Sequence, residues 1–425
     1  MNFRLKCVKC DQEYPGLEQR YRCDCSGTLD VIHDPSKFKL CTDDFDSRRN
    51  SNDPMNRSGV WRFRELILPL GDDLLSQCVV TRGEGNTHLY EASKLGTTIG
   101  VPNLWLKHEG ENPTGSFKDR GMTSGITMAR HLGMKQVACA STGNTSASMA
   151  SYAARCEMGA LVFIPEGKIA YGKLSQALAY GARTIQIDGD FDDAMRLVQD
   201  LCIEEGIYLL NSVNPFRIEG QKAIGFEIIQ DMGWKVPDWI VLPGGNLGNN
   251  TAMAKGMLEL YERGLIDRLP RMAVIQAAGA NPLYEAWTSG NPVQPMTADT
   301  IATAIKIGAP ISWRKSMRGI RALDGVVTQV NDDQIMDAKA QVDASGIGAE
   351  PASCATFAGL KRLVAEGVIG KNETVVGVLT GNLLKDPDVV VGYHTSTLDG
   401  IESARANAPV KAPADIEAIR QLIRS

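Results

Sequence analysis

Short apolar runs alternate with segments of helical spacing from about residue 100 to residue 381. The runs are continuous rather than alternating, which is typical of strands that are buried on both faces of a parallel sheet. We expect strands at 104–109, 136–142, 160–166, 184–189, 207–211, 239–245, 272–279 and 374–381. Segments such as NTSASMASYAARCE and FDDAMRLVQDLCIEE lie between them and have the period of helices. The alternation predicts an α/β protein with mostly parallel sheets flanked by helices.

Domain boundaries follow from this pattern and from the length of 425 residues, which is too long for one ordinary core. A polar stretch at 36–58 indicates a loop, and 280–320, which lacks a clear period, indicates an insertion with short helices. The expected units are a cysteine-bearing head at 1–35, a linker and the start of the large domain at 36–100, a smaller mobile α/β domain at 101–215, a large α/β domain at 216–392 and a tail at 393–425 that packs on the body or on a partner subunit.

Composition narrows the class of function. The chain is 43% hydrophobic and 22% charged, with a net charge of -5, which argues against a nucleic-acid partner bound by phosphate neutralisation. An anionic substrate then needs a local cluster of donors. There is no apolar run of ~18 residues and no signal-like start, so no membrane partner and a cytoplasmic location are expected. Reduced or metal-bound cysteines fit that compartment, and Cys139 and Cys202 lie in apolar runs typical of a core.

The first chemical candidate is Lys118, in ENPTGSFKDRG (111–121) after an apolar run. A lysine in the first turn of a helix beside a buried sheet edge has a lowered pKa, as a nucleophilic lysine requires. A solvated first-turn lysine is the alternative.

Three further segments lie where strands end. STGNTSAS (141–148) places hydroxyls and Asn144 at a helix start, which suits a carboxylate or is an ordinary N-cap. GGNLGNN (244–250) has glycines that let a backbone approach a phosphate, or forms a plain turn, and it matches neither nucleotide fingerprint. Thr380, in VVGVLTGN (375–382), ends a strand and is placed to bond a heterocycle or to cap that strand.

Together these segments resemble the threonine synthase family, in the fold-type-II group of pyridoxal-phosphate enzymes. The resemblance covers about residues 60–392. NPTGSFKDRG is shared across the group, whereas GKIAYGKLSQ, within 167–182, and NSVNPFRIEGQK (211–222) are particular to this family. The resemblance implies two open, mostly parallel sheets, a homodimer and one activity: a lyase that removes phosphate from O-phospho-L-homoserine and adds water, giving L-threonine.

The resemblance also implies a role for each matching position. Lys118 forms the Schiff base with pyridoxal phosphate and moves the protons, and Phe117 lies beside the cofactor. Asn144 bonds its phenolic oxygen, and Thr380 meets its pyridine nitrogen, where a hydroxyl does not fix a protonated ring as a carboxylate does. The cofactor phosphate is assigned to Gly245, Asn246, Leu247, Gly248 and Asn249. The substrate carboxylate is assigned to Ser141, Thr142 and Thr145, and the substrate phosphate to Asn211, Ser212 and Arg217.

Two positions depart from the family pattern. His88 stands where proline is usual, and it is either a catalytic base or an ordinary loop histidine. Leu383 stands where glycine is usual, and we expect it to narrow the pocket beside the cofactor ring.

The head carries Cys7, Cys10, Cys23 and Cys25 in a Cys-x2-Cys and Cys-x-Cys pattern. It resembles the zinc-ribbon-like head of many family members. Four thiolates are able to hold one tetrahedral structural zinc, although the second pair is one residue shorter than usual. A vestigial head of reduced cysteines is the alternative.

Rival functions remain open at this stage. A threonine or serine dehydratase shares Lys118 and the glycine loop but needs no phosphate site at Arg217. A synthase using O-phosphoserine keeps the phosphate donors and changes the pocket depth. A catalytically inactive scaffold conflicts with the retention of Lys118, Asn144 and Thr380 together.

Overall fold

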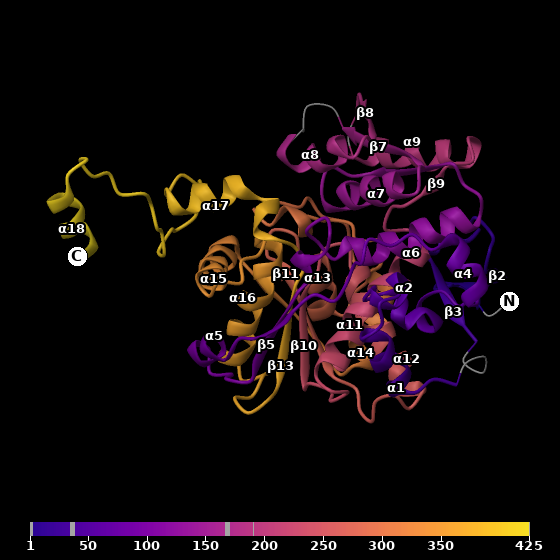
Figure 1. Ribbon diagram of the computed structural model, residues 1–425, viewed down its shortest axis with the longest axis horizontal. Coiled ribbons are helices and arrows are strands. Elements are labelled where there is room, and N and C mark those ends of the chain that lie inside the picture. Colours follow the sequence, from indigo (N-terminus) through magenta and orange to yellow (C-terminus); the bar gives the residue numbers. More distant parts are fainter. Residues whose placement is uncertain (1–2, 35–38, 166–170, 190, 425) are drawn as a thin grey trace.

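The computed structural model describes residues 3–34, 39–165, 171–189 and 191–424, so residues 167–170 of the GKIAYGKLSQ motif lie outside the described part. Two sheets form the body (Figure 1). The larger has six strands in the order β12-β11-β10-β13-β5-β4, and all neighbours are parallel except β4 and β5. Its strands are β4 (Leu89–Glu91), β5 (Leu104–His108), β10 (Trp239–Pro243), β11 (Arg271–Ala277), β12 (Val326–Val330) and β13 (Val375–Leu379).

The smaller sheet has four parallel strands in the order β8-β7-β6-β9. They are β6 (Gln136–Ala140), β7 (Gly159–Pro165), β8 (Arg183–Ile187) and β9 (Tyr208–Leu209). All the runs expected to form strands do so, and the α/β architecture predicted from their continuity is confirmed.

Helices cover both faces of the large sheet. Along β10, Ile240 and Leu242 face a core shared with α11, α12 and α14, while Trp239 and Val241 face a second core shared with α16. The helices are α1 (Thr42–Arg49), α2 (Pro54–Arg57), α3 (Arg64–Ile67), α4 (Asp72–Cys78), α5 (Ser93–Thr98), α6 (Lys118–His131), α7 (Asn144–Arg155), α8 (Tyr171–Ala179), α9 (Phe191–Glu204), α10 (Pro215–Gln221), α11 (Ala223–Asp231), α12 (Gly248–Glu262), α13 (Pro282–Ser289), α14 (Trp313–Ala322), α15 (Asp332–Ala344), α16 (Pro351–Ala365), α17 (Pro387–His394) and α18 (Ile416–Arg424). Short 3-10 turns lie at Trp61–Phe63, Glu109–Glu111, Thr303–Ile305 and Leu383–Lys385.

The structure corrects two predicted boundaries. The strand β5 belongs to the large sheet, where it pairs with β13, so the smaller domain does not begin at 101. A short apolar run shows that a strand is buried but not which sheet receives it. The stretch 36–58, predicted to be a loop, contains α1 and α2. Helix α1 is held by the buried ring of Phe45 and by an ion pair of 2.6 Å between Arg48 and Glu65.

Glycines bring α6 and α10 into backbone contact between the two sheets. A Cβ at Gly220 would lie 1.9 Å from the carbonyl oxygen of Arg120, and one at Gly121 would lie 2.8 Å from that of Arg217. Since real Cβ atoms do not approach so closely, the contact requires glycine at both positions. It fixes the helix that begins at Lys118 against the helix that carries Arg217.

The head and the tail lie at opposite ends of the molecule (Figure 1). The head is an antiparallel sheet of β1 (Phe3–Cys7), β2 (Glu13–Pro15) and β3 (Leu29–His33) in the order β2-β1-β3. In the tail, α17 packs through Tyr393 against Met336, whereas α18 has no buried residue and stands apart from the body. Within the described ranges, no helix combines the length and the apolar character needed to cross a bilayer.

Candidate active site

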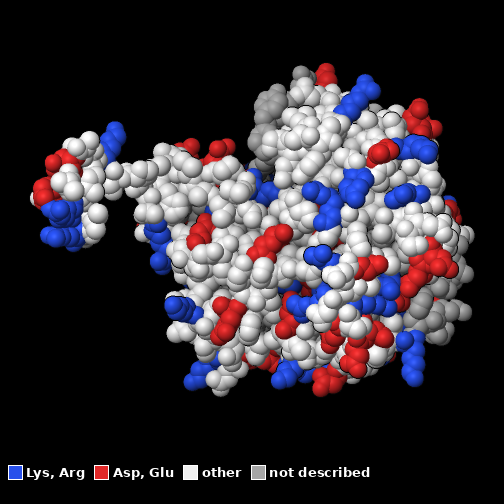
Figure 2. Space-filling model, in the orientation of Figure 1, with Lys and Arg blue, Asp and Glu red and all other residues white. Residues whose placement is uncertain are grey.

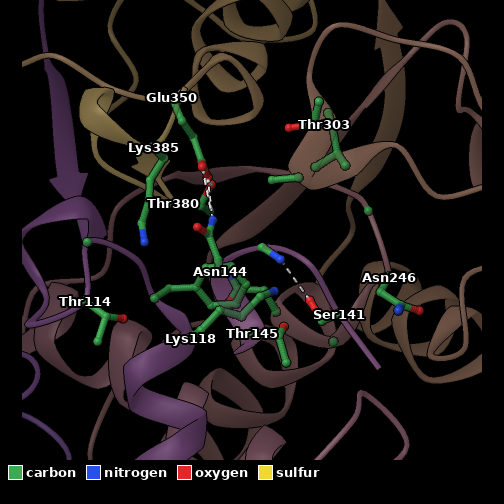
Figure 3. Close-up of a pocket in the computed structure, with 18 of the residues that line it drawn as sticks. Thr114, Lys118, Ser141, Asn144, Thr145, Asn246, Thr303, Glu350, Thr380 and Lys385 are labelled. Carbon is green, nitrogen blue, oxygen red and sulfur yellow. Dashed lines mark hydrogen bonds between the residues drawn. The ribbon is translucent and has the colours of Figure 1, made fainter. Parts of the chain in front are cut away.

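A cavity of about 620 Å³ lies at the carboxyl ends of β5, β6, β10 and β13, as expected for parallel α/β sheets (Figure 3). Every residue that the sequence assigned to the cofactor or the substrate lines it. These residues come from the starts of α6, α7, α10 and α12 and the loops that precede these helices, and from the residue that follows β13. They are Phe117, Lys118, Ser141, Thr142, Asn144, Thr145, Asn211, Ser212, Arg217, Gly245, Asn246, Leu247, Gly248, Asn249 and Thr380.

Lys118 is the first residue of α6, and its ammonium nitrogen lies 4.0 Å from the ring centre of Phe117. Burial, together with the nearby Arg217 guanidinium, lowers the pKa of Lys118 to about 7, although Glu350 acts in the opposite direction. A large share of these side chains is therefore neutral and nucleophilic at neutral pH, which an exposed lysine is not.

The loop before Lys118 is held by the next residue, Asp119, which is fully buried. Its carboxylate accepts hydrogen bonds from the backbone N–H of Thr114 at 2.7 Å, from the Thr114 hydroxyl at 2.6 Å and from the Ser148 hydroxyl on α7. Burial raises the pKa of Asp119 to about 6. This carboxylate ties the lysine-bearing loop to α7, the helix that begins at Asn144.

The glycine loop leads into the N-terminus of α12 with Leu247 in the left-handed region, at φ 64°. Several buried polar atoms around it have no hydrogen-bond partner among the residues that the structure describes, namely both amide atoms of Asn249 and the side-chain oxygens of Asn250 and Gln221. Buried polar groups are rarely left without partners. This part of the cavity is therefore built to receive a polar ligand, and the helix N-terminus favours an anion.

Arg217 is the buried cation of the cavity, with 3% of its surface exposed. Its Nη1 donates to the carbonyl oxygen of Leu210 at 3.0 Å, and its Nε has no partner in the described part of the chain. No carboxylate among the described residues pairs with it, and burial lowers its pKa to about 10, so it stays charged at neutral pH. An unpaired buried guanidinium is costly unless an anion joins it.

The two residues predicted to assist Arg217 have partners of their own. The Asn211 side chain accepts from the N–H of Ala140 at 2.9 Å and donates to its carbonyl at 3.0 Å, which ties the end of β9 to the end of β6. The hydroxyl of Ser212 accepts from the Asn246 amide at 3.0 Å. Both residues line the cavity and also hold its wall together.

Asn144 and Thr380 are linked by Glu350, which the sequence left without a role. Figure 3 shows Asn144 and Glu350 pointing toward one another, with the amide donating to the carboxylate at 3.1 Å. The Thr380 hydroxyl lies 3.0 Å from that of Ser353 and donates to Glu350 at 3.5 Å. Burial raises the pKa of Glu350. The sequence marks Glu350 only by its place directly before the apolar helix α16. A residue at that place is usually just a helix cap, so nothing in the sequence indicated a role in the cavity.

Other lining residues also carried little sequence signal. Lys385 donates to the Gln176 amide oxygen on α8, and burial lowers the pKa of Lys385. Thr303 and Ile305 come from the predicted insertion at 280–320. The latter packs within 3.0 Å of the place where a Cβ of Gly245 would lie, so this glycine is needed for close approach.

Both departures from the family pattern lie outside the cavity lining. The His88 side chain is 72% exposed and pairs with Glu111 at 2.8 Å, as a loop histidine does. The side chain of Leu383 packs on Gly348, and Leu384 lines the cavity instead. The expectation that Leu383 narrows the pocket was wrong, because the 3-10 turn at Leu383–Lys385 rotates this side chain away.

The four cysteines of the head come together. Their four sulfur atoms all lie within 4.8 Å of one another. The sulfur atoms of Cys7 and Cys25 are 3.6 Å apart, and those of Cys10 and Cys23 are 3.5 Å apart. A Cβ at Gly27 would lie 2.6 Å from the sulfur of Cys7, so a side chain at position 27 would clash with the cysteine cluster. Cys139 and Cys202 are buried in the core, as predicted.

The chain is similar to known proteins over nearly its whole length. The family described as pyridoxal-phosphate dependent enzyme matches residues 80–381. Threonine synthase from Methanosarcina acetivorans is 46% identical, covering 99% of this chain and 98% of that protein. Threonine synthase from Methanocaldococcus jannaschii is 42% identical, with 99% of each chain covered.

Solved structures agree in fold. The crystal structure of threonine synthase from Escherichia coli matches with a TM-score of 0.71, at 18% identity and with 99% of each chain covered. The structure of threonine deaminase isoform 2 from Solanum lycopersicum matches with a TM-score of 0.60, at 22% identity over 73% of this chain and 87% of that chain. At these identities the likeness concerns the fold alone. By its sequence relatives and its family match, the chain belongs to the threonine synthases of the pyridoxal-phosphate dependent enzyme family.

Proposed function

We propose that this protein removes phosphate from O-phospho-L-homoserine and adds water to give L-threonine, as a carbon–oxygen lyase that uses pyridoxal phosphate. The observation that carries the proposal is the joint placement of a lysine of lowered pKa and an unpaired buried arginine in one cavity. The lysine removes protons from carbon atoms of an amino acid. The arginine binds a second anionic group besides the carboxylate, and an unphosphorylated amino acid has no such group.

The cavity fits the cofactor. The glycine loop and the partnerless amide nitrogen of Asn249 suit its phosphate, and the α12 N-terminus favours the charge. Lys118 would supply the amine that its aldehyde needs, and Asn144 and Thr380 lie on the wall between α7 and β13. Pyridoxal phosphate, when bound, supplies the electron sink for charge that develops at the substrate carbon.

Within this proposal the chain's own groups bind the substrate and move its protons. The hydroxyls of Ser141, Thr142 and Thr145, at the start of α7, hold the substrate carboxylate. The neutral amine of Lys118 takes the proton from Cα, gives that proton up and then takes one from Cβ. After phosphate has left, Cγ receives a proton and water adds at Cβ. A pKa near neutrality suits both the removal and the return of a proton. Departure of phosphate from Cγ is assisted by Arg217, whose planar fork matches two phosphate oxygens.

Substrate comparison tests the proposal. The purified holoenzyme should release phosphate from O-phospho-L-homoserine and form threonine, with little release from O-phosphoserine, which is one carbon shorter and keeps its phosphate farther from Arg217. Formation of an oxo acid from threonine at a comparable rate would identify a dehydratase instead. Equal phosphate release from both phosphorylated amino acids would contradict the proposed substrate.

We also propose that the head holds one structural zinc. A tetrahedral site with Zn–S bonds of ≈ 2.3 Å has sulfur pairs about 3.8 Å apart. Three sulfur pairs of the head lie 3.4 to 3.6 Å apart, which is only slightly shorter than that spacing. The N–H of Lys9 donates to the Cys7 sulfur at 3.4 Å, and the Tyr14 hydroxyl lies 3.0 Å from the Cys23 sulfur, which orients both ligands.

A further inference from the structure

The head contacts the segment that carries the three residues assigned to the substrate phosphate. Asn211, Ser212 and Arg217 lie between the end of β9 and the third residue of α10. Their side chains line the cavity on one side of this segment. On its other side, residues of the head touch it before, within and after this stretch, through three independent contacts.

The first contact lies just before Asn211. The hydroxyl of Tyr21 accepts a hydrogen bond of 2.8 Å from the N–H of Leu209, and its ring meets that of Tyr208 at 5.8 Å. The strand β9 is at the edge of its sheet and pairs only with β6. Because Leu209 is fully buried, its outward N–H needs an acceptor, and a side chain of the head supplies it in place of a neighbouring strand.

The second contact lies beside Arg217. The ring of Phe3, on β1, meets the ring of Phe216 edge to face, with centres 6.0 Å apart and planes at 85°. Both rings are buried in the same core. The contact fixes the helical turn from which the Arg217 side chain leaves.

The third contact lies two residues after Arg217. In a helix, two residues are about 200° apart, so Glu219 faces away from the cavity. Its buried carboxylate lies 2.6 Å from the His33 ring and 2.5 Å from Lys255. Lys255 in turn pairs with Asp30 at 3.1 Å. His33 and Asp30 belong to β3, so a polar contact of the His33 ring and an ion-pair relay through Lys255 bind α10 to the head.

These contacts matter because, although the glycine contact with α6 also holds the backbone of α10, the Arg217 guanidinium itself has few partners. Its one hydrogen bond within the described protein goes to Leu210, inside the same segment, and no carboxylate clamps it. The direction of its guanidinium therefore follows the backbone of 209–217. A binding group keeps its geometry only when the residues behind it are fixed.

We propose that the head is a positioning element for the substrate phosphate: Tyr21, Phe3 and the polar side chains of β3 hold the β9–α10 segment so that Arg217 meets the phosphate. The inference rests on the proposed assignment of Arg217. Loosening the head should weaken phosphate binding and leave proton transfer at Lys118 unchanged, since Lys118 is carried by α6 and held through Asp119.

The test compares variants of the full-length holoenzyme. Tyr21→Phe deletes only the oxygen that accepts from Leu209. Loss of one hydrogen bond that leaves a buried N–H without a partner should raise the Kd for inorganic phosphate about fivefold, measured by calorimetry. KM for the phosphorylated substrate should rise by the same factor while kcat and the cofactor spectrum stay constant. Phe3→Leu, which removes a different contact, should act in the same direction and is the second variant if Tyr21→Phe does not fold.

Two controls separate the possible outcomes. Arg4→Gln breaks an exposed ion pair with Glu13 on the head itself, and it should bind phosphate like the unmodified protein. Arg217→Ala should lose phosphate binding. If Arg217→Ala loses it while Tyr21→Phe and Phe3→Leu bind normally, the positioning role is overturned and the proposed function stands. Equal weakening by Arg4→Gln also overturns it. Unchanged binding in Arg217→Ala overturns the phosphate assignment on which both depend.

Discussion

Lys118 and Arg217 lie in one cavity, and the arginine alters the lysine. The guanidinium adds to the burial that lowers the pKa of Lys118, so the arginine assigned to a distant phosphate also keeps the lysine neutral. Figure 2 shows acidic and basic side chains interspersed over the face in view, and no broad basic surface is visible there. Within the proposed function, positive charge for the substrate is supplied locally by the buried Arg217.

The first prediction concerns the lysine in protein freed of cofactor. The rate at which pyridoxal phosphate attaches should rise with pH and reach half its maximum near the Lys118 pKa of about 7, because only the neutral amine attacks. Arg217→Gln removes a cause of the lowered pKa, so its midpoint should move to higher pH. Lys306→Gln, which removes an exposed charge outside the cavity, should not move it. A midpoint near the value of a free lysine in both proteins would refute the assignment.

The second prediction concerns Arg217 in catalysis. Losing a bidentate charge-assisted contact costs on the order of 2–4 kcal/mol, so Arg217→Ala should lower kcat/KM for O-phospho-L-homoserine roughly 30- to 1000-fold. Arg217→Lys should recover only part, since lysine lacks the fork. Spectral titration with threonine, measured well above the pH midpoint of the first prediction, should change little. If both quantities fall equally, Arg217 is a structural residue.

At the scale of elements, the cavity depends on close contacts between segments far apart in the chain. Glycines 121 and 220 let α6 and α10 touch, and Asn211 joins β9 to β6. Glu350 joins α7 to the end of β13, where the sequence had placed only a threonine hydroxyl. This carboxyl group beside Thr380, whose pKa is raised by burial, was not among the surroundings that the sequence predicted for Thr380.

The third prediction concerns the cysteine head. Freshly purified protein should contain about one zinc per chain, and Cys7→Ser should lower zinc content and Tm while kcat stays unchanged, because the cluster lies outside the cavity lining. Cys41→Ser, which changes an exposed cysteine outside the cluster, should keep its metal and its Tm. Loss of kcat in a folded Cys7→Ser protein would contradict a purely structural metal.

At the scale of the whole molecule, the tail has surface that the body does not cover. Helix α18 is nine residues long and exposes Ile416 at 70% and Ile423 at 79%. So short a helix is not stable alone in water. The chain up to Asn407 is tied to the body through Tyr393 and His394, which leaves α18 to reach outward (Figure 1).

The fourth prediction follows from this exposed helix. We expect the protein to be a homodimer in which α18 packs on the second copy. Deleting 413–425 should therefore reduce the mass measured by light scattering to that of one chain at low concentration. Replacing Ile416 and Ile423 by serine should act in the same direction without shortening the chain. An unchanged dimer in both variants would assign α18 another role.

The sequence by itself determined most strands of the two sheets and the segments that carry the candidate chemistry. Continuous apolar runs identified the buried strands, and NPTGSFKD, STGNTSAS and PGGNLGN marked the residues that now line one cavity. These features are local: a strand's burial and a helix start are written in adjacent residues. Tertiary structure alone decided that β5 joins the large sheet, that Glu350 and Lys385 enter the cavity and that the head backs the Arg217 segment. Those outcomes depend on which surfaces pack together across long separations, and the pattern along one chain does not contain them.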